Sequence, residues 1–151
     1  MILAPHFLAS AALASQVKKP ILIAIFAVIL HFLIDRISHW DYKLSEKPNS
    51  KWDVILPVSA DLLFGVITVA VIAAAGDWTF RQYFLANFGA FFGLLPDGFI
   101  ALWKIYPQNK YLSAYHRVKK KLHVASRPDF KNGVPQEIAV VIIAILILTL
   151  L

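Results

Sequence analysis

The sequence predicts an all-α fold: an integral membrane helical bundle with four or five transmembrane helices and one amphipathic interfacial helix. The chain of 151 residues is 59% hydrophobic, and its mean hydropathy is +0.66. One water-soluble domain of this size cannot bury that much apolar surface. The apolar residues also form long runs over the whole chain, and most basic residues lie between these runs. We therefore expect residues 1–151 to form a single transmembrane helical domain.

Cysteine content and charge limit the chemistry of the chain. The sequence contains no cysteine, so a metal site would have to use histidine and carboxylate ligands. The formal net charge is +6, but an anionic membrane surface attracts basic residues that lie between apolar runs. We therefore expect membrane lipids as partners, and no nucleic acid.

The first 40 residues predict two helices. Pro5 fits the first turn of a helix, and small apolar residues follow it until Lys18 and Pro20 end the helix. This helix is short for a span, which leaves the number of spans at four or five. Residues 21–40 are mostly apolar, and at ~1.5 Å per residue they cover the ~30 Å hydrocarbon core of a bilayer. They predict the second helix, with polar residues in its last two turns.

A charged loop separates the second helix from two further spans. Residues 41–53 are rich in charge, and aromatic residues flank them, as is typical of a membrane interface. We expect a third helix over residues 54–75 and a fourth over residues 79–106. The fourth is long enough to span the bilayer and to continue past a kink at Pro96.

The remainder of the chain predicts a surface helix and a last span. Residues 127–135 contain two prolines and a glycine and predict a break, and residues 136–151 predict the last span. Residues 108–126 predict an amphipathic helix on the membrane plane, because four of the five residues 117–121 are basic. Apolar residues recur in this segment at helical spacing, at Leu112, Tyr115, Val118 and Leu122.

Connecting these helices up and down across a membrane brings the ionisable residues to one face. All five histidines and five of the nine carboxylates then lie within a few turns of that face: His6, His31, His39, His116, His123, Asp35, Asp41, Asp61, Asp97 and Glu137. All but three of the 15 Lys and Arg residues lie there too. By the positive-inside rule, this face is predicted to be cytoplasmic.

His31, Asp35 and His39 form the most informative motif. Each is rotated by only ~40° from the one before at 3.6 residues per turn, so all three would share one helix face. Imidazole and carboxylate ligands suit a divalent metal, with zinc first and manganese or iron as alternatives. The competing interpretation is a structural hydrogen-bond ladder between helices, or contact with lipid headgroups.

Further residues of the same face are candidate metal ligands. Asp97 follows Pro96, which frees backbone carbonyls, and it is either a ligand or a turn residue at the interface. His6, His116 and His123 are candidate ligands because the up-and-down arrangement places them near Asp97.

Two carboxylates of this face are candidates for proton transfer. Asp61 lies about two turns into the third helix, and Asp41 lies just beyond the second. Either could accept the proton from a metal-bound water as a catalytic residue. The lysines at 119–121 are expected to contact headgroups, or to attract an anionic substrate.

Several of these motifs occur together in a known family. They are the early His6, the HFLIDRISHWD segment at 31–41, the LLPD turn at 94–97 and the two histidines of HRVKKKLH at 116–123. In this combination the chain resembles the small bacterial, LexA-regulated inner-membrane proteins described as metal-dependent hydrolases. That family is more remotely similar to zinc-dependent phospholipase C and P1-type nucleases. The resemblance implies metal-dependent hydrolysis in the inner (plasma) membrane.

The sequence thus predicts a membrane-embedded metal-dependent hydrolase that acts on an anionic phosphoester, for example in a lipid headgroup, at the cytoplasmic face. The alternative is a non-catalytic small membrane protein that binds or conducts divalent ions. Conduction would require polar residues to continue to the opposite face, where few are found: Thr68, Thr79, Gln82 and Asn87. This one-sidedness favours a site that opens at the surface.

Overall fold

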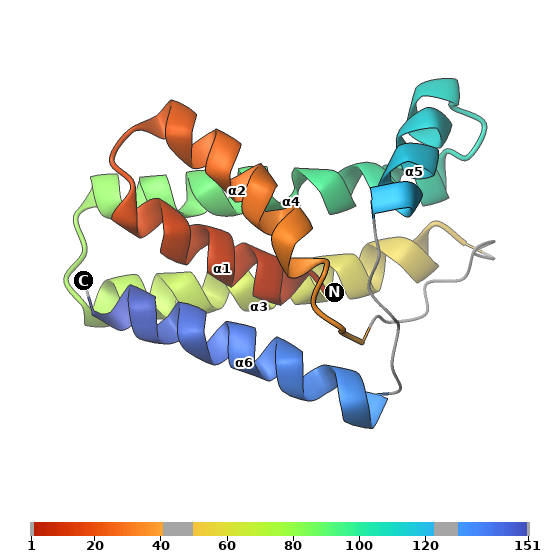
Figure 1. Cartoon of the computed structure of the whole chain (residues 1–151). Helices are drawn as coiled ribbons and strands as arrows, with labels where there is room; N and C mark the ends of the chain where they lie inside the picture. Colours follow the sequence, from red (N-terminus) through yellow and green to blue (C-terminus); the bar gives the residue numbers. More distant parts are fainter. Residues whose placement is uncertain (1, 41–49, 123–129, 151) are drawn as a thin grey trace.

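The computed structural model describes residues 2–40, 50–122 and 130–150, and every regular element in these ranges is an α-helix. The all-α prediction is confirmed. Among the described residues, α3, α4 and α6 are long and apolar enough to cross a membrane, while α2 is apolar but has only 15 residues. The helices are, in chain order, α1 (Leu3–Gln16), α2 (Pro20–Ile34), α3 (Trp52–Ala75), α4 (Phe80–Ile105), α5 (Lys110–Leu122) and α6 (Phe130–Thr149) (Figure 1).

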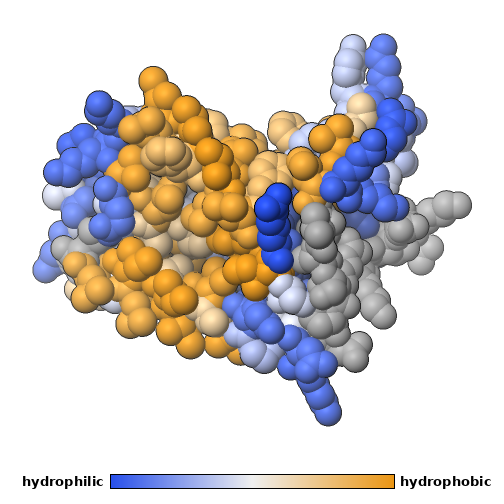
Figure 2. Space-filling model, viewed as in Figure 1, coloured by the Kyte–Doolittle hydropathy of each residue, from blue (hydrophilic) through white to orange (hydrophobic). Residues whose placement is uncertain are grey.

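Apolar side chains cover the outside of the bundle. Figure 2 shows a broad apolar band between hydrophilic groups at the two ends. Large exposed apolar residues come from every described helix except α1, among them Ile25 of α2, Ile67 of α3, Phe91 of α4 and Ile142 of α6. So much exposed apolar surface is unfavourable in water, and it is consistent with association with a membrane.

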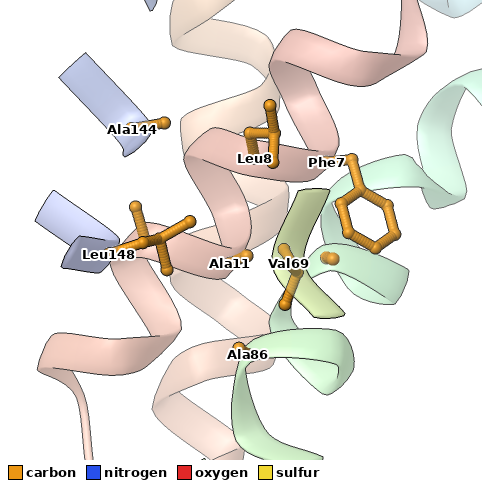
Figure 3. Packing of buried hydrophobic residues seen from close by; sticks show 9 residues of the cluster. Phe7, Leu8, Ala11, Val69, Ala86, Ala144 and Leu148 are labelled. Carbon is orange, nitrogen blue, oxygen red and sulfur yellow. The ribbon is translucent and has the colours of Figure 1, made fainter. Parts of the chain in front are cut away.

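The short helix α1 forms the centre of the bundle. It packs against α2, α3, α4 and α6, and ten of its 14 residues are buried. The sequence predicted that this first helix is short for a membrane span. At helical rise its length is ~21 Å, which is less than the thickness of a bilayer core. The surrounding helices supply its partners in a core that includes Phe7, Leu8 and Ala11 of α1, Val69 of α3, Ala86 of α4, and Ala144 and Leu148 of α6 (Figure 3).

Two glycines of α4 allow it to lie close against α1. A Cβ on Gly89 would lie 2.8 Å from the carbonyl oxygen of Ser10, and one on Gly93 would overlap the Ser10 side chain. Small residues at such positions let helix backbones approach each other. His6 lies one turn before Ser10, so the same contact holds His6 near α4.

The end of α2 differs from the sequence-based expectation. The helix ends at Ile34, about six residues earlier than expected. The N–H groups of Arg36 and Ile37 bond to carbonyls three residues back, which tightens the last turn and ends the helix. His39 therefore does not continue the helix face of His31, and the prediction that His31, Asp35 and His39 share one helix face is wrong for His39.

The start of α6 also differs. The helix begins at Phe130, within the segment where the sequence predicted a break, and it contains Pro135. Gly133 allows the first turns to pack tightly, because a Cβ there would lie only 2.8 Å from the Cβ of Trp40. This contact between distant segments supports turns that glycine and proline disfavour locally.

Candidate metal centre

His31 of α2 is held in one tautomer by α4. Its Nδ1 lies 2.8 Å from the carbonyl oxygen of Gly93. A carbonyl can only accept a hydrogen bond, so Nδ1 carries a proton and donates it. Metal-binding histidines are commonly oriented in this way by a backbone carbonyl. In the neutral ring, Nε2 of His31 therefore presents a lone pair.

Asp35, which follows the last residue of α2, lies against His6 and His31. Its Oδ1 is 3.1 Å from Nε2 of His6, and its Oδ2 is 3.2 Å from Nε2 of His31. The two imidazole rings are stacked with their centroids 4.1 Å apart, and both are fully buried. One carboxylate thus lies beside the Nε2 atoms of both rings.

Asp97 of α4 completes the group. Its Oδ2 lies 3.9 Å from Nε2 of His6, and its Oδ1 lies 3.9 Å from Nε2 of His31. Within the described part of the chain, the buried Oδ2 has no hydrogen-bond partner. Ligand atoms of His6, His31 and Asp97 all lie within 4.8 Å of one another. Ligands of a tetrahedral zinc ion lie roughly 3.3–3.6 Å apart, so a small closure would complete such a site.

The electrostatics of this group favour a cation. Nε2 of neutral His31 is an acceptor, and the carboxylate oxygens of Asp35 and Asp97 near it are acceptors as well. Acceptors that face each other in a buried site repel unless a proton, an ammonium or a metal ion lies between them. Two imidazoles and two carboxylates form a donor set that suits zinc, manganese or iron.

An ammonium group from α5 reaches into the same site. Lys119 is 8% exposed and forms an ion pair with Oδ1 of Asp97. Its Nζ also lies 3.0 Å from Nε2 of His31 and 3.4 Å from Oδ2 of Asp35. Burial alone would lower the pKa of Lys119, but the charges of Asp97 and Asp35 outweigh it and hold this pKa above the ordinary value for lysine.

The sequence did not single out Lys119. It lies in a run of three lysines that were expected to contact headgroups, and the structure buries Lys119 while Lys120 and Lys121 are exposed. The only signal was spacing, because position 119 lies one turn after Tyr115 on the same helix face.

That face of α5 docks on α4. The hydroxyl of Tyr115 donates to the carbonyl oxygen of Pro96 over 3.0 Å, and the ring of His116 stacks on Trp103 with centroids 3.7 Å apart. His116 is therefore placed against α4, and among the described residues it does not belong to the group of potential ligands.

Asp61 occupies a different position from the expected one. Its Oδ2 accepts hydrogen bonds from the backbone N–H groups of Leu3 and Ala4, at the start of α1. The sequence predicted that α2, α3 and α4 would bring Asp61 to Asp35 and Asp97. Instead, α1 packs on all three of these helices, and Asp61 meets its first turn.

His39 is the remaining candidate that the structure describes, and it does not belong to the group of potential ligands. His39 is buried after the end of α2, where its Nδ1 lies 2.6 Å from the carbonyl oxygen of Ile37. Asp41 and His123 lie outside the described residues. The structure thus brings together His6, His31, Asp35 and Asp97 from the predicted set, and adds Lys119.

A comparison of the chain with protein-family models, curated proteins and solved structures found no match. The function must therefore be argued from the chemistry of the site.

Proposed function

We propose that this protein is a membrane-embedded, metal-dependent hydrolase in which His6, His31 and Asp97 hold a divalent ion, with zinc as the first candidate. The observation that carries the proposal is the convergence of three ligand atoms, from α1, α2 and α4, within 4.8 Å of one another. The hydrogen bond from His31 to Gly93 supports it, because it aims a lone pair at the site. The resemblance to LexA-regulated inner-membrane hydrolases points in the same direction.

The residues suggest a division of roles. A bound divalent ion would supply a water of lowered pKa and polarise a phosphoryl oxygen. Asp35 lies against both imidazoles and is placed to accept a proton or to orient the rings. We assign the proton-accepting role to Asp35 in preference to Asp61, because Asp61 is engaged at the start of α1.

The substrate class follows from charge and position. We propose an anionic phosphoester at the level of the headgroups, with α5 as the interfacial helix beside the site. Arg117, Lys120 and Lys121 are exposed on α5, where they would attract an anion. We further propose four or five spans in the inner membrane with the site at the cytoplasmic face, because only Lys18, Lys19 and Arg81 are basic at the opposite end.

Metal analysis of the purified protein tests whether the site binds a divalent ion. The wild type should retain about one equivalent of zinc or a related ion, and His31→Ala and Asp97→Asn should lose it. His116→Ala is the matched control, because His116 stacks on Trp103 and lies outside the ligand group. A wild type that binds no divalent ion after metal is supplied would refute the proposal.

Turnover of phosphoesters by the metal-loaded protein tests whether the site is catalytic. The metal-loaded wild type should hydrolyse at least one member of a panel of phosphomonoester and phosphodiester lipids and nucleotides, and Asp35→Asn should abolish this. One observation favours a non-catalytic, ion-binding protein instead: Asp35 and Asp97 both contact the Lys119 ammonium, which restrains carboxylates that a hydrolase needs. Stoichiometric metal without hydrolysis across the panel would select that alternative.

A further inference from the structure

Lys119 occupies a position that is unusual for a lysine on an amphipathic helix. Its two neighbours in the lysine run are exposed, whereas its own ammonium enters the site between α2 and α4. All three acceptors that it contacts belong to the candidate metal centre: Asp97, Asp35 and Nε2 of His31.

The contact with His31 cannot coexist with a metal bond at the same atom. Nδ1 of His31 donates its proton to Gly93, so Nε2 has one lone pair. That lone pair either accepts a hydrogen bond from Lys119, whose Nζ is 3.0 Å away, or binds a metal ion at ~2.0–2.1 Å. Repulsion between the ammonium and a divalent ion would add to this exclusion.

We propose that Lys119 is a tethered cation that competes with the metal ion for His31 and Asp97, so that metal binding releases Lys119 and loosens α5 from the end of the bundle. This inference rests on the proposed metal site. Without metal, the ammonium compensates the buried carboxylate of Asp35 and the partly buried carboxylate of Asp97. With metal, the released ammonium joins Lys120 and Lys121 at the surface and increases the attraction of an anionic substrate.

The packing of α5 allows such a release. Among the described helices α5 packs mainly on α4, where Tyr115 bonds to Pro96 and lies edge-on to Phe99, and His116 stacks on Trp103. Val118, on the same final turns as Lys119, is 56% exposed. After His116, Lys119 is the only buried residue of α5, so within the described residues it is the side chain that holds the last turns of α5 to the bundle.

Zinc affinity of the full-length protein in detergent tests the competition. Lys119→Met keeps most of the length of the side chain but removes its charge. This variant should bind zinc at least ~tenfold more tightly than the wild type, because the ion no longer displaces an ammonium. Lys120→Met, at the exposed neighbouring lysine, is the matched control and should bind zinc like the wild type. Equal or weaker zinc binding by Lys119→Met would overturn the inference while leaving the metal site intact.

A distance measurement tests the release and does not depend on the folding of Lys119→Met. The chain has no cysteine, so spin labels can be placed on Leu102→Cys in α4 and Lys121→Cys in α5, both exposed. Saturating zinc should lengthen or broaden the distance between the labels, and adding His31→Ala should remove the effect. An unchanged distance in zinc-loaded protein would overturn the inference alone, whereas failure of every variant to bind zinc would refute the metal site and the proposed function with it.

Discussion

Asp61 of α3 caps the first turn of α1, where its Oδ2 accepts a hydrogen bond from the backbone N–H of Ala4 over 3.2 Å. The N–H of Leu3 donates to the same oxygen, and Ile2 at the N-cap position provides no side-chain bond. The first N–H groups of a helix have no partner within it, and a negative charge near them is favourable. Asp61 therefore caps α1 from another helix, a role that a Ser or Asp at the N-cap position usually has. The capped N–H groups lie within one turn of His6.

Replacing this cap should weaken the fold without removing the metal. Asp61→Asn loses the charge, so we expect the free energy of unfolding to fall by about 1 kcal/mol, measured by thermal or denaturant unfolding in detergent. Asp77→Asn is the control, since Asp77 is exposed and has a positive φ that Asn also tolerates. Loss of bound metal in Asp61→Asn would instead make Asp61 part of the metal centre.

The close approach of α1 and α4 should depend on Gly93. In Gly93→Ala the new methyl group would lie 2.5 Å from Cβ of Ser10, so the helices must separate, at a cost of ~1–3 kcal/mol in stability. Gly98→Ala on the same helix is the control, because nothing lies within 4 Å of its Cβ position. The double variant with Ser10→Gly should recover much of the loss, and a failure to recover it would contradict this explanation.

Metal removal should lower thermal stability. If the ion binds only the folded protein, a free concentration of 100 times its Kd stabilises the fold by ~2.7 kcal/mol, and a strong chelator should abolish this gain. The melting temperature of the wild type should therefore fall after chelation and recover when zinc is restored. His31→Ala should show the same melting temperature with and without the chelator.

Alkaline pH should remove the contribution of Lys119 to stability. The pKa of Lys119 is raised in the folded protein by Asp97 and Asp35, which outweigh the effect of burial. A group whose pKa is higher in the folded than in the unfolded state stabilises the fold fully below the unfolded value, and the contribution is lost as pH rises through the folded value. Without metal, the wild type should therefore melt at a higher temperature than Lys119→Met. This difference should stay constant up to about pH 10.4, the ordinary pKa of lysine, and should shrink at higher pH. A difference that stays constant through this range would contradict the ion pair.

Orientation can be tested with a reporter. The bias of basic residues toward the end of the bundle that carries the site predicts that this end is cytoplasmic. A reporter inserted at Ser50, next to the start of α3, should report the cytoplasm, and one inserted at Asp77, between α3 and α4, should report the other side. The reverse pattern would place the site outside and would exclude a cytoplasmic substrate.

Much of the fold could be predicted from local patterns. The apolar runs predicted the bounds of α3 and α4 to within two residues. These bounds are set locally: Thr79 and Gln82 form a capping box at the start of α4, and Gly76 follows the end of α3. Counting helix lengths also placed His31, Asp35 and Asp97 at one end of the bundle, since rise per residue is fixed. Local patterns failed at residues 35–40 and 130–135, where a tightened last turn and a contact between Gly133 and Trp40 decide the structure.

The sequence by itself determined the all-α class of the protein and the end at which many of its ionisable residues gather, because these depend on composition and on helical periodicity. It did not determine the number of spans: it predicted four or five, whereas three of the described helices are long and apolar enough to cross a membrane. Only the tertiary structure decided which of the ionisable residues meet. In the tertiary structure α1 lies at the centre of the bundle, so His6 stacks on His31 and Asp61 caps the first turn of α1. It also decided that Lys119, alone of the three consecutive lysines, enters the site. Which face of α5 docks on α4 depends on packing between helices, and residue spacing within α5 does not determine that packing.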